Sequence, residues 1–198
     1  MQNTYEWKVV PSNQPKVIRS CPKCGNHSEY ESSGNFRVNA NQSRLDIWLI
    51  YQCTKCKNTW NMEILSRISS STVNKELYEK YLSNDTSLAK QYAFDTITHS
   101  RNKSVLNYED LQYDVLGCCF KPENITEPIQ IKVLCDYPMN LRLDKVLSLK
   151  LGITREHVKK LENCGMLSSE GIKDIGKAKI RTGMILTLNA PQNIVVDS

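Results

Sequence analysis

The spacing of apolar residues in the N-terminal third of the chain predicts strands. Apolar and polar residues alternate over residues 59–64, and a polar turn at 41–44 separates the stretches 36–40 and 45–52. A two-residue period is typical of a strand that buries one face, and a short polar turn between two such runs indicates a hairpin. We therefore expect a small antiparallel sheet. The aromatic residues that should cover it are Trp48, Tyr51 and Trp60.

Helical spacing replaces this pattern after the serine-rich stretch 69–72, which is typical of a linker leading into a helix cap. Apolar residues recur at helical intervals from Leu77 to Leu82, and again after Asn84 and Asp85, whose side chains suit a helix N-cap. Two short helices are therefore expected. In the connection that follows, the expected strands are residues 113–116 and 129–135.

Two further helices are predicted near the C-terminus. The first covers residues 141–151 and ends at Gly152, because glycine readily takes the left-handed conformation that ends a helix. Thr154 is a good N-cap for the second helix, which ends at Gly165. A final strand is expected at residues 184–188.

The composition is that of a globular protein. The 198 residues are 40% hydrophobic and 24% charged, with eight glycines and seven prolines, which excludes a disordered or collagen-like chain. The longest apolar run, residues 47–51, is far shorter than the roughly 20 residues of a transmembrane helix. The first residues lack the basic and apolar regions of a signal peptide. We therefore expect a cytoplasmic protein that does not associate with membranes.

Charge is distributed unevenly along the chain, although the net charge is only +5. Residues 1–70 hold nine basic and five acidic residues, residues 71–138 hold seven and ten, and residues 139–198 hold ten and six. Basic ends permit contact with nucleic acid without requiring it. We expect three parts with these boundaries: an N-terminal domain, a connecting segment of helices and strands, and a C-terminal domain.

Four of the eight cysteines form two Cys-x-x-Cys motifs, Cys21 with Cys24 and Cys53 with Cys56. Each motif can direct two thiolates at one tetrahedral Zn²⁺, with Zn–S distances of roughly 2.3 Å. A closed set of four thiolates favours a structural zinc over a catalytic one. A redox role is disfavoured, because thioredoxin-like motifs occur singly and near a βαβ pattern. We therefore expect one structural Zn²⁺, held by a zinc ribbon in residues 1–70.

The remaining cysteines are expected to pack in the core and not to bind metal. Free cysteine behaves as a small buried hydrophobe, and no histidine or carboxylate stands at a recognisable metal-site spacing from these residues. They are Cys118, Cys119, Cys135 and Cys164.

The C-terminal residues resemble a known RNA-binding domain. Residues 142–147, 151–155, 165–167 and 179–183 are similar to the αL RNA-binding domain of the fourth small-subunit ribosomal protein, which pseudouridine synthases and tyrosyl-tRNA synthetases share. The resemblance implies a helix pair that holds structured RNA. The phosphate contacts that it implies are Arg142, Lys145, Arg155 and Lys159, and the basic stretch that follows adds Lys177, Lys179 and Arg181.

The whole chain also resembles a bacterial family of unknown function, domain-of-unknown-function family 1062. The similarity lies in residues 33–41, 46–51 and 59–61, around the cysteine motifs. It supports the expected architecture and implies no chemistry.

Together these features predict an α+β fold, with an N-terminal zinc ribbon of antiparallel hairpins, a short helical middle segment, and a C-terminal αL RNA-binding-like helix pair with a small β-sheet. The function we expect is non-catalytic binding of structured RNA, in a ribosomal or transfer RNA context. The alternative is a zinc-stabilised regulatory module that binds DNA, or binds a protein partner through the zinc ribbon. An enzyme is disfavoured, because His99 and His157 have no carboxylate or nucleophile at a recognisable motif distance.

Overall fold

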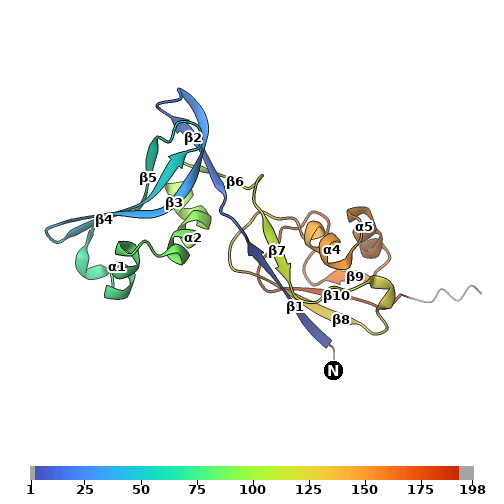
Figure 1. Cartoon of the computed structure of the whole chain (residues 1–198). Coiled ribbons are helices and arrows are strands. Elements are labelled where there is room, and N and C mark those ends of the chain that lie inside the picture. Colours follow the sequence, from blue (N-terminus) through green and yellow to red (C-terminus); the bar gives the residue numbers. More distant parts are fainter. Residues whose placement is uncertain (1–2, 192–198) are drawn as a thin grey trace, which may run out of the picture. The chain divides into compact units, whose positions relative to one another are not determined.

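The computed structural model describes residues 3–191 and divides the chain into two compact units. One unit is residues 12–112, and the other combines the residues up to Pro11 with those from Tyr113 onward (Figure 1). Each unit contains its own five-stranded sheet. The chain therefore passes between the units twice, once on each side of residues 12–112.

The sheet of the 12–112 unit is entirely antiparallel. Its strands are β2 (Lys16–Cys21), β3 (Asn26–Asn41), β4 (Arg44–Cys53), β5 (Thr59–Ser69) and β6 (Val105–Asn107). Their order across the sheet is β5-β4-β3-β2-β6. In β4, buried Leu45, Ile47 and Leu49 alternate with more exposed residues, as expected for a strand with one face in the core.

Three short helices complete this unit: α1 (Lys75–Leu82), α2 (Thr86–Phe94) and α3 (Thr96–Arg101). A 3-10 turn at Ser70–Thr72 precedes them. α1 and α2 pack against β3 (Figure 1). α3 packs against β5 and β6. Each helix begins at a side chain that accepts a hydrogen bond from a free backbone N–H, which stabilises its first turn. These caps are Asn74, Asp85 and Asp95.

The core of the 12–112 unit joins the sheet, the helices and the two cysteine motifs. Tyr30, Tyr51 and Tyr81 are at most 1% exposed, and the Phe36 ring lies edge-on to Tyr81, with 5.1 Å between the ring centroids. Cys21 and Cys53 belong to the same buried cluster. The motifs are therefore anchored in a core larger than that of an isolated ribbon.

The second unit has a mixed sheet. Its strands are β1 (Asn3–Pro11), β7 (Tyr113–Leu116), β8 (Ile129–Cys135), β9 (Leu167–Ser169) and β10 (Met184–Leu188). The order is β7-β1-β8-β10-β9, and β1 runs parallel to β8 while the other pairs are antiparallel. Trp7 and Val9 of β1 are fully buried, so the N-terminal strand is part of this core.

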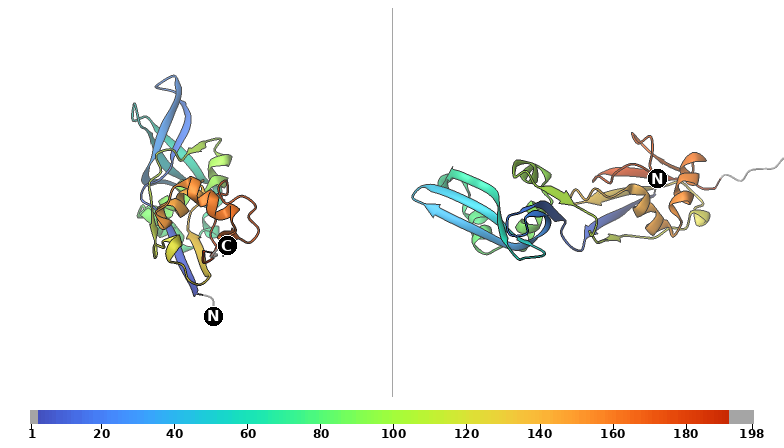
Figure 2. Two further views of the ribbon diagram at one scale, coloured as in Figure 1. Left: turned by 90° about the vertical axis from the view of Figure 1, so that its right-hand side faces the viewer. Right: turned by 90° about the horizontal axis from the view of Figure 1, so that it is seen from above.

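Two helices of this unit lie side by side, α4 (Leu143–Leu151) and α5 (Arg155–Asn163) (Figure 2). A 3-10 turn, Pro122–Asn124, lies upstream of β8. Two predicted helix boundaries are confirmed: Gly152 ends α4 with a left-handed φ of 64°, and the Thr154 hydroxyl caps α5 by accepting a hydrogen bond from the His157 N–H at 3.2 Å. The other two boundaries differ by about two residues, because α4 begins at Leu143 and α5 ends at Asn163. α5 packs against β9.

The predicted fold class is wrong. The part of the chain that the structure describes is mostly β, with 40% strand and 25% helix, and its strands form two sheets. The C-terminal part is not an αL-like helix pair with a small sheet, because α4 and α5 belong to a unit whose five-stranded sheet takes in the N-terminal strand β1. Residues 1–70 do not form a separate zinc ribbon either. β1 belongs to the sheet of the other unit, and β6, which lies outside residues 1–70, belongs to the sheet that carries the cysteine motifs.

The unit boundaries lie at 11/12 and 112/113, whereas the sequence led us to expect boundaries at 70/71 and 138/139. The difference arises because α1 to α3 pack on the first sheet and do not form a connector. Among residues 3–191, none of the helices is long and apolar enough to cross a membrane.

Candidate metal centre and basic surface

The two Cys-x-x-Cys motifs fold into matching loops at the ends of strands. β2 ends at Cys21 and β4 ends at Cys53. In each loop the backbone N–H four residues after the first cysteine donates to its carbonyl oxygen, from Gly25 at 2.9 Å and from Lys57 at 3.0 Å. Gly25 and Lys57 both have a left-handed φ, of 71° and 59°. Each loop thereby turns back on itself and presents two thiols on one side.

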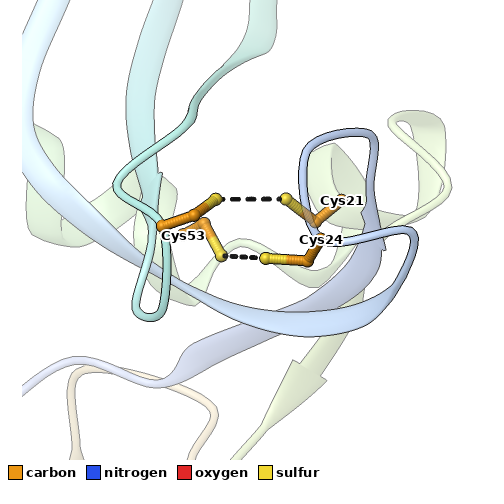
Figure 3. A group of neighbouring side chains, drawn as sticks. Cys21, Cys24 and Cys53 are labelled. Carbon is orange, nitrogen blue, oxygen red and sulfur yellow. Dashed lines mark hydrogen bonds between the residues drawn. The ribbon is translucent and has the colours of Figure 1, made fainter.

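The four thiols of these loops converge on one point. Cys21 Sγ lies 3.5 Å from Cys56 Sγ, and Cys24 Sγ lies 3.9 Å from Cys53 Sγ. All four sulfur atoms are within 4.8 Å of one another, and the side chain of Cys24 points across toward Cys53 (Figure 3). Four sulfur atoms around one tetrahedral zinc would be about 3.8 Å apart. The arrangement can therefore hold one metal ion with four thiolate ligands.

Hydrogen bonds favour the thiolate form in the first cysteine of each motif. The Tyr30 hydroxyl donates to Cys21 and lowers its pKa to about 6. The backbone N–H of Cys56 lowers the pKa of Cys53. The pKa of Cys24 is instead raised to about 12, first because its thiol is hydrogen-bonded to Cys56. Thiolate is the form that binds metal, so a divalent cation would favour ionisation of all four.

The prediction that the remaining cysteines are buried is wrong. Cys118, Cys119 and Cys164 are exposed, and Cys135 is half-buried. The expectation failed because it rested on the average behaviour of free cysteine, and the loop after β7 and the end of α5 lie at the surface. None of these residues joins the cluster of four thiols.

Two of the expected RNA contacts, Arg142 and Arg155, are brought together by Asp144. Arg142 immediately precedes α4, and Arg155 begins α5. Both guanidinium groups lie 2.8 Å from the same Asp144 carboxylate oxygen. The Asp144 side chain is only 5% exposed, whereas those of Arg142 and Arg155 are 38% and 46% exposed. The buried carboxylate fixes two cations that still face solvent.

Three lysines extend this positive region. Lys177 pairs with Asp174 at 3.1 Å, and the pKa of Asp174 is lowered chiefly by Lys177 and further by the charge of Lys159. Lys179 forms a β-bridge with Arg142, which also donates to the Gly176 carbonyl oxygen. All three lysines are exposed. We call this set the basic surface: Arg142, Arg155, Lys159, Lys177 and Lys179.

The other two expected RNA contacts, Lys145 and Arg181, are not part of the basic surface. Lys145 is exposed on α4, and Arg181 lines a cavity of 410 Å³ together with Glu170. Sequence reasoning missed Asp144 as the residue that organises the basic surface. The available signal was an acidic residue two positions after Arg142, at the start of a helix in a basic stretch.

The comparisons with known proteins give a family and no activity. A family model described as a protein of unknown function (DUF1062) matches residues 38–172. No curated protein and no solved structure was found to match the chain. The matched range begins in β3 and ends after β9, so it includes the second cysteine motif and both α4 and α5. The chain belongs to the DUF1062 family of proteins of unknown function.

Proposed function

We propose that this protein binds structured RNA, without catalysis, through the basic surface of its C-terminal unit. The observation that carries the proposal is the pair of half-exposed guanidinium groups fixed by buried Asp144. Guanidinium groups suit phosphate recognition, because their N–H donors match the geometry of phosphate oxygens. Holding two of them in place reduces the side-chain entropy that binding would otherwise cost.

The charge balance of the surface supports the same conclusion. The region has five basic side chains and three carboxylates, which are Asp144, Asp174 and Glu162, the last accepting a hydrogen bond from the Ile175 N–H at 2.7 Å. It therefore keeps a positive charge. The basic residues come from the start of α4, from α5 and from the segment before β10. A rigid surface with charges spread over several elements suits the fixed phosphate positions of folded RNA.

We further propose that the metal of the four-cysteine site is a single structural Zn²⁺. Four thiolates in a compact, tetrahedron-like set are the ligands of structural zinc sites, and they leave no open position for a substrate. The ion would cross-link the ends of β2 and β4. In this proposal the metal stabilises the 12–112 unit and takes no part in RNA contact.

Titration with unfractionated transfer RNA at several salt concentrations tests the RNA proposal. Arg155→Ala and Lys159→Ala should each weaken binding and reduce the salt slope by about 0.7–0.9, because each removes one phosphate contact. Lys121→Ala is the matched control. It removes one exposed positive charge from the same unit. Lys121 lines a cavity at the C-terminal end of α4, whereas Arg142 lies at the N-terminal end of this helix.

Equal salt slopes for Arg155→Ala and Lys121→Ala would contradict the use of the basic surface. Equal affinity for duplex DNA of similar length would favour the DNA-binding regulatory alternative. Binding that shows no salt dependence would favour a protein-interaction module.

A further inference from the structure

The adjacent residues Cys118 and Cys119 form a surface dithiol separate from the four-cysteine site. Both side chains are exposed, and both follow β7 in a segment without strand hydrogen bonding. Their side chains are therefore not forced to opposite faces, as they would be in a regular strand. Two thiols on neighbouring residues can act together on one soft ligand.

The backbone of this dithiol is held in place on both sides. Gly117 has a φ of 110°, and a Cβ at this position would lie 2.2 Å from the Glu6 carbonyl oxygen, so only glycine fits there. The Trp7 indole N–H donates to the Cys118 carbonyl oxygen at 2.8 Å. On the other side, the Phe120 N–H donates to the Lys150 carbonyl oxygen at 3.2 Å. The loop is thus fastened to β1 and α4.

The buried Lys150 side chain adds a further anchor. Lys150 is only 4% exposed, and its ammonium group donates to the carbonyl oxygens of Gly117 and, at 3.3 Å, of Val115. The ammonium also lies 5.9 Å from the centre of the Trp7 ring. These two hydrogen bonds hold residues 115–117 next to α4. The two thiols that follow lie at the surface.

Neighbouring cysteines are poorly placed to form a disulfide with each other. Consecutive Cα atoms across a trans peptide are about 3.8 Å apart, whereas disulfide-linked Cα atoms are usually about 4.4–6.8 Å apart. The pair is therefore disposed to remain as two thiols. A single atom bonded to both sulfur atoms avoids the short S–S bond, so it does not require the Cα–Cα distance of a disulfide.

A cavity with a mainly apolar lining, which also includes Lys121 and Glu123, adjoins Cys119. It has a volume of 490 Å³, and Cys119 lies in its wall. Its other lining residues include Phe120, Leu149, Leu151 and Ile153, and the Leu149 side chain is 58% exposed. A ligand held by the two sulfur atoms could place an apolar substituent in this cavity.

We propose that Cys118 and Cys119 form a binding site for trivalent organoarsenicals, with the organic group in the adjoining cavity. With phenylarsine oxide, both thiol protons leave with the arsenic-bound oxygen as one water molecule, and two As–S bonds replace the As=O bond. Arsenic and sulfur keep their oxidation states, so no oxidant or reductant is needed. This site is independent of the proposed RNA contact.

Native mass spectrometry of the purified, metal-containing protein with phenylarsine oxide tests the site. The wild type should bind one equivalent that survives glutathione and is removed by dimercaptopropanol. Cys118→Ser and Cys119→Ser should each bind about 100-fold more weakly, because they lose the second, intramolecular bond. Cys164→Ser is the matched control, since Cys164 is exposed but has no neighbouring cysteine. It should behave as the wild type.

Two results would overturn the proposal: unchanged binding in both Cys118→Ser and Cys119→Ser, or an adduct that forms only as metal is lost from the four-cysteine site. The cavity has its own test in Leu149→Ser. This variant should weaken phenylarsine oxide binding and leave inorganic arsenite binding unchanged. Equal affinity of Leu149→Ser and the wild type for phenylarsine oxide would exclude the cavity from the site.

Discussion

His99 on α3 is a titratable side chain inside the 12–112 unit, and only 1% of it is exposed. Its Nδ1 lies 2.9 Å from Ser104 Oγ, and its Nε2 lies 3.2 Å from the Ala93 carbonyl oxygen. Burial lowers the pKa of His99 below 6.5, because the imidazolium ion is poorly solvated there. The unfolded chain therefore binds more protons than the folded chain as the pH falls through about 6.5, the pKa of an unfolded histidine. The free energy of unfolding should decrease from about pH 7.5 to about pH 5.5.

The variant His99→Gln should lose less stability over this pH range than the wild type, because glutamine keeps polar groups but does not titrate. Urea denaturation followed by tryptophan fluorescence at both pH values measures the difference. His27→Gln provides the control, since His27 is exposed in the same unit. Identical pH dependence in the wild type and His99→Gln would show that the acid sensitivity has another source, such as protonation of the four thiolates.

At the scale of elements, a single side chain covers part of the free edge of β5. Asn102, directly after α3, accepts a hydrogen bond from the Glu63 N–H and donates one to the Glu63 carbonyl oxygen, both at 2.8 Å. Its carboxamide replaces the backbone of a neighbouring strand at this position. An uncovered edge presents free N–H and C=O groups on which another chain can pair.

Asn102→Ala should lower the free energy of unfolding by about 1 kcal/mol, because both hydrogen bonds to Glu63 are replaced by bonds to water. It should also increase self-association through β5. Asn102→Asp keeps the acceptor for the Glu63 N–H but places a carboxylate oxygen against the Glu63 and Thr98 carbonyl oxygens, which now accept from the Asn102 amide, so it should be no more stable than the alanine variant. Thermal denaturation and light scattering at several protein concentrations measure the two effects. An alanine variant that melts and scatters like the wild type would show that this contact does not protect the edge.

Elements with a complete local signal could be predicted from the sequence, and elements that depend on distant partners could not. The cap and the apolar spacing of a helix lie within a few residues of each other, as in the helices capped by Asp85 and Thr154. The strand at 184–188 is likewise marked by its own short apolar run. β1 has only a short alternation around Trp7 and Val9, and its parallel partner β8 lies more than half the chain away. The predicted fold class was wrong because it omitted this pairing.

The candidate sites follow the same rule. The cluster of four thiols could be predicted, because each Cys-x-x-Cys loop is defined by its own spacing and both loops serve one tetrahedral ion. The position of Asp144 between Arg142 and Arg155 could not, because it depends on how α4 packs against α5. The exposure of Cys118 and Cys119 likewise depends on how the loop is anchored to Trp7 and Lys150.

At the scale of the whole molecule, each of the two units has its own core and its own tryptophan side chains, whose signals report on its folding. The three tryptophans are divided between them: Trp48 and Trp60 lie in the 12–112 unit, and Trp7 lies in the other. Trp7 is fully buried and its indole N–H is bonded to the Cys118 carbonyl oxygen. Trp60 packs against Tyr30 and Tyr51, close to the cysteine motifs, with the Arg19 guanidinium 3.9 Å from the centre of its ring.

Removal of the metal should therefore unfold the 12–112 unit and leave the other unit folded. Cys21 and Cys53 are part of the buried core, and metal binding at such a site is coupled to folding. Metal analysis of the purified protein should give one zinc per chain and, after a chelator, none. In ¹H–¹⁵N NMR spectra the indole signals of Trp48 and Trp60 should then collapse to unfolded positions, while that of Trp7 stays in place.

Two variants separate loss of the metal from other effects of chelation. Cys56→Ser should give the spectrum of the chelated protein without any chelator, because three thiolates hold the ion less tightly than four. Cys164→Ser should keep both the zinc and all three indole signals, since Cys164 is exposed in the other unit. If the Trp7 signal disappeared together with the other two, the units would fold as one cooperative body. A purified protein that is folded but contains no zinc would refute the proposed role of the ion, because the core of the 12–112 unit would then need no cross-link between β2 and β4.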